Sequence, residues 1–106
     1  MWFFDLKSAF HHIQMVEKHR KYSGLSVTLE GRERFFRFTS MPFGYRDASR
    51  ILTKVMRTPL TRWRTLGIPS CIHIDGGIGF KPTMKEAQVA AKMVRSDLLK
   101  LGLVVR

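Results

Sequence analysis

At 106 residues the chain has the length of about one small domain, so a function that needs several domains would require it to be a piece of a longer protein. Hydrophobic residues make up 44% and charged residues 25%, and no stretch reaches the roughly 18 to 20 apolar residues of a membrane span, so we expect a soluble protein with a packed core and no membrane partner. The 19 Lys and Arg exceed the 8 acidic residues by a net charge of +11, which suits a polyanionic partner such as nucleic acid.

The single cysteine, Cys71, excludes an intramolecular disulfide. It fits an intracellular location, in the reducing cytoplasm or nucleus. We expect Cys71 to be a buried strand residue. The apolar residues at the start of the chain are interrupted by Asp5 and Lys7, so no signal peptide is predicted.

The chain begins with residues typical of a short buried strand. Trp2 to Leu6 is an apolar run with one acid, which predicts a strand that carries Asp5 near its end. The next residues, Lys7 to His12, predict a turn or a short helix.

Two β-prone runs follow, Tyr22 to Leu29 and Arg34 to Thr39. The four residues between them, Glu30 to Glu33, have the length and composition of a hairpin loop. Pro42 and Gly44 then end the second strand, because proline and glycine are typical of turns.

A first helix is predicted from about Ala48, with Asp47 as its N-cap. Pro59 is expected to end or kink this helix near Thr58, because proline lacks the N–H of the helical hydrogen bond. Beyond Pro59 the apolar stripe is expected to continue as far as Gly67. Its members recur at three- and four-residue spacing: Ala48, Ile51, Leu52, Val55, Met56, Leu60, Trp63 and Leu66.

A second helix is the most clearly marked element. Thr83 followed by Glu86 is a capping-box pattern, and Gly102 marks the end of the helix. Leu103 to Val105 then read as the start of a strand. The apolar face of the helix consists of Ala87, Ala90, Ala91, Val94, Leu98 and Leu101.

Another hairpin is predicted between the two helices, where Cys71 to Ile74 and Ile78 to Phe80 flank Asp75-Gly76-Gly77. Asp75 therefore ends an apolar strand, as Asp5 does. If the two strands are adjacent, both carboxylates could converge on divalent metal ions, which prefer oxygen ligands. The alternative is that Asp75 belongs to a plain hairpin turn and Asp5 is a strand-end acid. The order of elements predicts one α+β unit.

Three motifs occur in the order and spacing typical of retrotransposon reverse transcriptases, which are RNA-directed DNA polymerases. They are Phe4-Asp5-Leu6-Lys7-Ser8-Ala9-Phe10-His11-His12-Ile13, Met41-Pro42-Phe43-Gly44-Tyr45 and Ile72-His73-Ile74-Asp75-Gly76-Gly77. Over nearly its whole length the chain resembles the palm region of these enzymes, which implies an antiparallel sheet with two packed helices. It is most similar to elements that carry a tyrosine recombinase, on Lys18-His19-Arg20-Lys21-Tyr22 and Trp63-Arg64-Thr65-Leu66-Gly67-Ile68.

The resemblance implies a role for six of these residues. Asp5, the carbonyl of Leu6 and Asp75 would hold Mg²⁺ in a two-metal site that activates the primer 3′-hydroxyl and neutralises the triphosphate. Phe10 matches the aromatic residue that packs under the sugar and disfavours a ribose. Its alternative is a core aromatic. Phe43 and Gly44 match the loop that lines the nucleotide pocket, and their alternative is a simple turn.

The third motif departs from the family pattern at two positions. Active relatives have aromatic-x-Asp-Asp, whereas this chain has His73 at the aromatic position and Gly76 at the second aspartate. Loss of one acidic ligand removes about one negative charge from a site for two dications. We therefore expect weak polymerisation or none. His73 is a poor substitute because Mg²⁺ prefers oxygen, although strand alternation would place His73 and Asp75 on one face.

Basic residues recur at helical spacing on one face of the first helix, and they could follow a template backbone: Arg46, Arg50, Lys54 and Arg57. The alternative is a solvated face opposite the apolar stripe. His11, His12 and His19 have no second soft ligand nearby, so we interpret them as surface or packing residues and not as a zinc site.

The resemblance makes residues 1–106 a partial palm domain, truncated at both ends, without the fingers before Trp2 or the thumb after Arg106. Its implied partners are an RNA or DNA template-primer and a deoxynucleoside triphosphate. Unpaired sheet edges would favour marginal stability and self-association. Two other functions stay open, a non-catalytic basic module that binds nucleic acid and a decayed retroelement remnant with no selected function.

Overall fold

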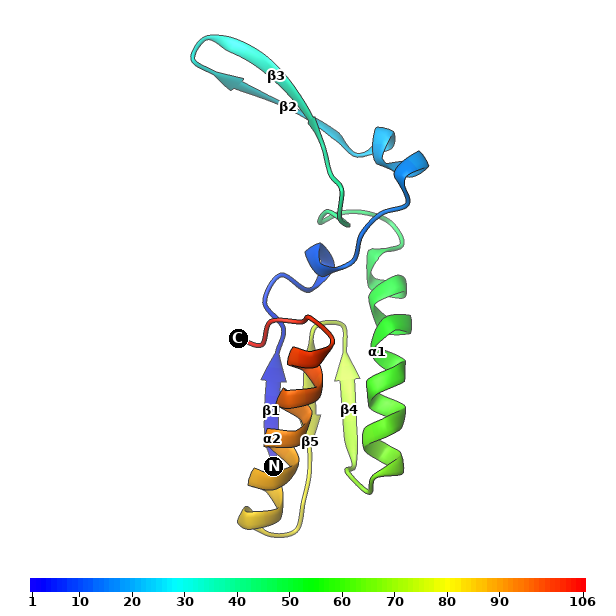
Figure 1. Cartoon of the computed structure of the whole chain (residues 1–106), viewed down its shortest axis with the longest axis vertical. Coiled ribbons are helices and arrows are strands. Elements are labelled where there is room, and N and C mark those ends of the chain that lie inside the picture. The colour runs from blue at the N-terminus through cyan, green and yellow to red at the C-terminus, as the bar shows by residue number, and fades with distance from the viewer.

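The computed structural model describes the whole chain, residues 1–106. It has an α+β fold with antiparallel sheets and two long helices, as predicted, and it is compatible with a truncated palm-like fragment. Figure 1 shows a sheet with packed helices and, beyond it, a projecting hairpin. The molecule measures 59 × 27 × 20 Å along its principal axes. The elements in chain order are β1 (Trp2–Asp5), η1 (Ala9–His12), η2 (Glu17–Tyr22), β2 (Gly24–Leu29), β3 (Arg32–Arg37), α1 (Ala48–Thr65), β4 (Ser70–His73), β5 (Gly76–Gly79) and α2 (Met84–Lys100); η1 and η2 are 3₁₀ helices.

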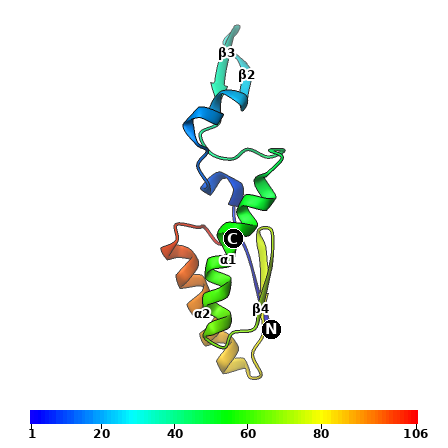
Figure 2. The ribbon, with the colours of Figure 1, turned by 90° about the vertical axis from the view of Figure 1, so that its right-hand side faces the viewer.

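The larger sheet has three antiparallel strands in the order β1-β5-β4. Helix α1 packs against β4 and α2 packs against β1, and Figure 2 shows both helices on the same side of this sheet. The other face is open, since Phe3 is 82% exposed and His73 is exposed as well. Cys71 also lies exposed on this face, so the prediction that it would be buried is wrong. Strand alternation explains this, because its neighbours Ser70 and Ile72 take the positions that face the helices.

Strand β5 is rich in glycine because two aromatic rings lie over it. A Cβ added at Gly77 would stand 2.2 Å from the Phe4 ring, and one added at Gly79 would stand 2.1 Å from the Trp2 ring. The rings of β1 thus occupy the space that side chains of β5 would fill. Phe4 also meets Trp63 of α1 edge-on, with ring centroids 6.0 Å apart. Aromatic packing therefore connects the sheet to the helix layer.

Helix α1 runs through Pro59 to Thr65, so it does not end near Thr58, which was one of the two outcomes predicted for this proline. Proline removes one helical hydrogen bond, but Pro59 lies on the buried face, where packing offsets that loss. Two predicted members of the apolar stripe, Val55 and Leu66, are instead 44% and 48% exposed. The buried residues of the helix are Ala48, Leu52, Met56, Pro59 and Trp63.

Helix α2 begins at the predicted cap, where the N–H of Glu86 donates to Thr83 Oγ1 at 3.2 Å. Its buried residues match the predicted face, although Leu101 is 56% exposed, because the helix ends at Lys100 and Leu101 is its C-cap. The buried set is Ala87, Ala90, Val94 and Leu98. None of the helices is both long and apolar enough to cross a membrane.

Asp97 ties α2 to α1. Its carboxylate accepts hydrogen bonds from Trp63 Nε1 at 2.9 Å and from Arg62 Nε at 3.0 Å. Burial would raise the pKa of Asp97, but the hydrogen bonds from Arg62 and Trp63 and the positive charges of Arg62 and Lys100 outweigh it. The pKa of Asp97 therefore lies below its ordinary value.

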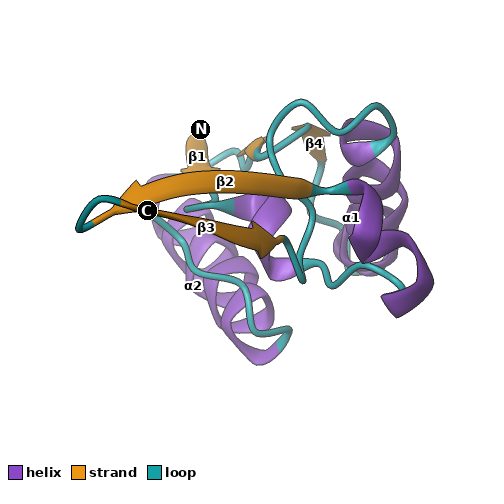
Figure 3. Cartoon of the chain, turned by 90° about the horizontal axis from the view of Figure 1, so that it is seen from above, coloured by secondary structure: helices purple, strands orange, loops and turns teal.

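The β2–β3 hairpin projects away from the helices (Figure 1). Figure 3 looks down on this hairpin, with α1 and α2 beneath it. Its loop is formed by Glu30 and Gly31, with φ of 53° and 74°, so the predicted four-residue loop is wrong. Positive φ at both positions is the geometry that matches the natural twist of two strands. Every strand residue of the hairpin except the half-buried Val27 is exposed.

The residues after α2 do not form a strand, contrary to the prediction for Leu103 to Val105. Val105 instead forms an isolated antiparallel bridge with Leu6, flanked by a hydrogen bond from the Lys7 N–H to the Val104 carbonyl at 2.8 Å. Asp47 precedes α1 as predicted but makes no capping hydrogen bond.

Candidate functional site

The pairing of β1 with β5 brings both candidate metal ligands to one end of the sheet. Asp5 is the ladder partner of Gly76, the residue after Asp75. The N–H of Leu6 donates to the backbone carbonyl of Asp75 at 2.8 Å. The strand that leads into Asp75, β4, is not adjacent to β1, since β5 lies between them. The turn between β4 and β5 nevertheless places the backbone of Asp75 beside that of Leu6.

The β4–β5 hairpin turns at Ile74 and Asp75, so the predicted turn at Asp75, Gly76 and Gly77 is wrong. Both glycines lie in β5, where the rings of β1 need the space. Ile74 has φ of 55°, a region that β-branched residues rarely adopt. The strand alternation that would place His73 and Asp75 on one face ends at His73.

Asp5, Gly76 and His73 form one row across the open face, because Gly76 pairs with Asp5 on one side and with His73 on the other. A Cβ added at Gly76 would have the carbonyl oxygens of Phe4 and His73 as its nearest neighbours, at 3.8 and 3.9 Å. These are ordinary contact distances. Position 76 therefore has room for a side chain next to Asp5.

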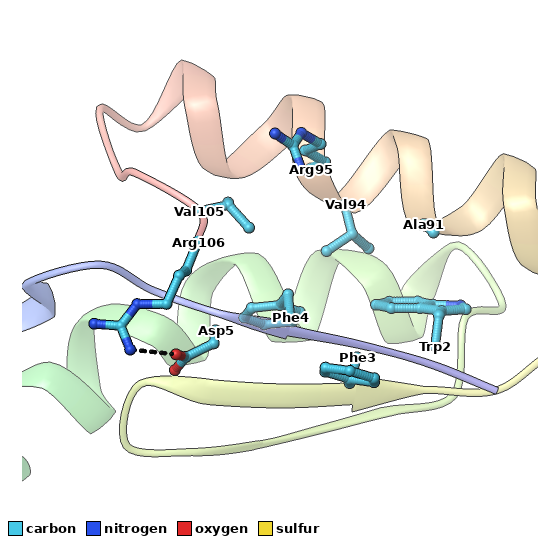
Figure 4. Close-up of a pocket in the computed structure, with 9 residues that line it drawn as sticks. All are labelled: Trp2, Phe3, Phe4, Asp5, Ala91, Val94, Arg95, Val105 and Arg106. Atoms are coloured by element: carbon cyan, nitrogen blue, oxygen red, sulfur yellow. Dashed lines mark ion pairs between the residues drawn. The ribbon is translucent and has the colours of Figure 1, made fainter.

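Asp5 already has a cationic partner in Arg106. Arg106 Nη1 lies 3.3 Å from Asp5 Oδ2, the pair marked in Figure 4. The two side chains are 69% and 41% exposed, and such surface pairs contribute only about 0 to 1 kcal/mol. A cavity of about 310 Å³ lies beside this pair, lined by Trp2, Phe3, Phe4, Asp5, Ala91, Val94, Arg95, Val105 and Arg106.

The donor atoms near the β4–β5 turn fit the chemistry of Mg²⁺ but are few. Asp5 and Asp75 supply carboxylates, and the Leu6 carbonyl accepts none of the backbone hydrogen bonds of the turns and loops. Mg²⁺ keeps several waters and is usually bound by one or two carboxylates together with substrate phosphates. No group of three or more His, Cys, Asp or Glu is placed to hold a metal ion. Two carboxylates and one carbonyl are thus close to the smallest number of protein ligands that would bind Mg²⁺.

The second part of the candidate site is a contact between η1 and the loop after β3. The rings of Phe10 and Phe43 meet edge-on with centroids 5.8 Å apart, so two of the residues predicted to line a nucleotide pocket lie together. Phe43 is 72% exposed. Gly44 has φ of 82°, which glycine adopts without strain, and a Cβ there would meet nothing within 4 Å.

His11 belongs to this cluster, although the sequence indicated only a surface or packing role. Its Nδ1 lies 3.1 Å from the Met41 carbonyl oxygen, and its ring stands 5.0 Å from Phe43. His11 follows Phe10 in the first motif, and that position was the available signal. The contact with Met41 joins residues 30 positions apart, which spacing does not predict.

The basic residues of α1 lie opposite its buried stripe. Exposed on that side are Arg50, Lys54 and Arg57. Neither Lys54 nor Arg57 takes part in a salt bridge. Arg50 lies 3.6 Å from Asp47. Arg46 is exposed but precedes the helix in a turn, so its predicted place on the helix face is wrong.

The family described as reverse transcriptase (RNA-dependent DNA polymerase) matches residues 1–106, the whole chain. The chain therefore belongs to the reverse transcriptase family. A relative from Cassava vein mosaic virus, described as "Putative enzymatic polyprotein", is 26% identical over 102 residues. The alignment covers 96% of this chain and 15% of the relative, so the chain spans a small part of that polyprotein.

Proposed function

We propose that residues 1–106 are part of the palm domain of an RNA-directed DNA polymerase from a retroelement, of the type that carries a tyrosine recombinase. Its template-directed nucleotidyl transfer is impaired. The observation that carries this proposal is the position of Asp5 beside the Asp75 turn, with the hydrogen bond from the Leu6 N–H to the Asp75 carbonyl at 2.8 Å. The partners of this site are an RNA or DNA template-primer and a deoxynucleoside triphosphate.

Each residue of the site has a role in the proposed reaction. The carboxylates of Asp5 and Asp75 and the carbonyl of Leu6 would hold Mg²⁺, which would supply the positive charge that activates the primer hydroxyl and neutralises the triphosphate. Phe10 packs under the sugar and excludes a ribose. Phe43 meets Phe10 edge-on and, with Gly44, lines the pocket.

The proposed impairment follows from Gly76. This position lies next to Asp5 on the open face but supplies no carboxylate. Arg106 adds a positive charge 3.3 Å from Asp5, which further disfavours a dication. Loss of one acid from a metal cluster usually costs orders of magnitude in rate.

Metal binding and primer extension test this proposal in a matched pair of variants. Gly76→Asp adds a carboxylate and Gly76→Ala adds a side chain without charge, and neither Cβ meets an obstruction. We expect Gly76→Asp to bind Mn²⁺ at least about tenfold more tightly than Gly76→Ala, a difference of about 1.4 kcal/mol, because hard dications prefer carboxylate oxygen. Extension by the unsubstituted chain should be at background with Mg²⁺ and Mn²⁺.

Robust extension that Asp5→Asn abolishes would contradict the impairment. Equal Mn²⁺ affinity in the two Gly76 variants would contradict the place of residue 76 in the site. Tighter Mn²⁺ binding by Gly76→Asp without extension would show that the missing carboxylate at residue 76 is not the only cause of the impairment.

A second candidate function is a non-catalytic module that binds nucleic acid through α1. It is favoured by the exposed positions of Lys54 and Arg57, which have no acidic partner in the chain. Affinity for RNA or DNA should then fall steeply with salt, because bound Lys and Arg release counterions from the phosphates. Arg50→Ala with Lys54→Ala should weaken binding more than the equal loss of charge on α2, Lys92→Ala with Arg95→Ala.

Activity and binding decide between these functions. If Asp5→Asn leaves nucleic-acid affinity unchanged and extension is absent, the binding module is favoured. Absence of metal, nucleotide and nucleic-acid binding would favour a decayed remnant with no selected function.

A further inference from the structure

His11 contacts two segments that the chain brings to η1 from beyond β3. Its Nδ1 lies 3.1 Å from the Met41 carbonyl oxygen. Its ring meets Phe43 edge-on, with centroids 5.0 Å apart and planes at 79°, and lies parallel to Phe38 at 6.4 Å. One side chain therefore touches both the base of the hairpin and the loop that carries Phe43.

The hydrogen bond fixes the chemistry of the imidazole. A carbonyl oxygen can only accept, so Nδ1 must carry the proton. The neutral Nδ1–H form and the imidazolium both satisfy this requirement. Met41 is 2% exposed, and its own N–H donates to the Ile13 carbonyl at 2.9 Å. Both backbone groups of Met41 are thus held by the segment that contains His11.

Phe43 lies two residues beyond this anchor and is 72% exposed. Surrounding core atoms therefore do little to fix its ring. Its aromatic contacts are with His11 and Phe10, at centroid distances of 5.0 and 5.8 Å. The position of Phe43 depends on how the Met41 end of the loop is held.

We propose that His11 is a positioning residue of the nucleotide pocket, which holds the loop from Met41 to Gly44 so that Phe43 stands beside Phe10. This inference rests on the proposed polymerase function. The next residue, His12, provides a natural control. Its Nδ1 lies 3.0 Å from the Ser8 carbonyl oxygen, so this exposed hydrogen bond joins two residues of the same local turn.

Amide hydrogen exchange at Met41 tests the anchor without requiring activity. In His11→Ala the Met41 amide should exchange about 5- to 30-fold faster, the factor expected from a lost hydrogen bond and its accompanying ring contacts. The amide of Leu98 in α2 should not change. His12→Ala should leave Met41 unaffected. His11→Asn, whose amide nitrogen can take the place of Nδ1, should restore much of the protection.

Equal acceleration at Met41 and Leu98 would indicate general destabilisation and overturn the proposal. So would an unchanged Met41 amide in His11→Ala, or an equal effect of His12→Ala.

Calorimetric titration with dTTP and Mg²⁺ tests the role in the pocket. His11→Ala should weaken dTTP binding by about the same factor as it accelerates exchange of the Met41 amide. His11→Asn should recover part of the lost dTTP affinity. His12→Ala should bind dTTP as tightly as the unsubstituted chain. Faster exchange at Met41 with unchanged dTTP affinity would overturn the positioning role. Absence of dTTP binding by the unsubstituted chain would refute the pocket and the proposed polymerase function, whereas the exchange result still decides whether His11 holds the loop.

Discussion

Replacing Gly77 by alanine should disrupt the packing between β1 and β5. The added Cβ would stand 2.2 Å from the Phe4 ring, and two further ring atoms lie at 2.3 and 3.0 Å. Phe4 cannot retreat freely, because its ring packs edge-on against Trp63, which is fully buried. Overpacking of this kind costs about 1 to 3 kcal/mol. For a chain of this length the melting temperature should fall by about 4 to 8 °C for each kcal/mol.

The neighbouring glycine provides the control. A Cβ added at Gly76 would meet nothing closer than the Phe4 carbonyl oxygen at 3.8 Å, on the open face of the sheet. Gly76→Ala should therefore be neutral or stabilise by up to about 1 kcal/mol, because alanine reduces the freedom of the unfolded chain. Urea unfolding of both variants measures the difference. If Gly76→Ala is as destabilising as Gly77→Ala, the packing of the Phe4 ring over β5 is refuted.

Two further predictions concern the helix pair and the projecting hairpin. The lowered pKa of Asp97 means that its stabilising effect is complete above its ordinary value of 3.8 and is lost as pH falls through the folded value. Asp97→Asn should therefore lower the free energy of unfolding at pH 7. It should also make that free energy decline less steeply as pH falls from about 5 to 2, which urea titrations across this range would measure. A decline as steep as in the unsubstituted chain would contradict this account. Glu30→Asn should slow amide exchange in β3 by stabilising the hairpin by about 0.5 to 1 kcal/mol, because asparagine tolerates the φ of 53° at this position better than glutamate. Faster exchange there would contradict it.

Local patterns in the sequence were enough to predict where α2 begins, to which family the chain belongs and where it departs from the family pattern. Thr83 and Glu86 predicted the start of α2 correctly because capping depends on residues three positions apart. Three ordered motifs indicated the reverse transcriptase family, to which the whole chain belongs. The departure at Gly76 is likewise visible in the sequence.

Features that depend on contacts between distant residues could be decided only by the tertiary structure. Helix α1 continues through Pro59 because that residue is buried with the rest of the stripe. Cys71 is exposed because no helix covers its side of the sheet. The ladder between β1 and β5 decides that Asp5 stands beside the Asp75 turn, and that Gly77 must lack a side chain where the Phe4 ring lies. Sequence spacing carries no information on such pairings, since register is set by packing across strands.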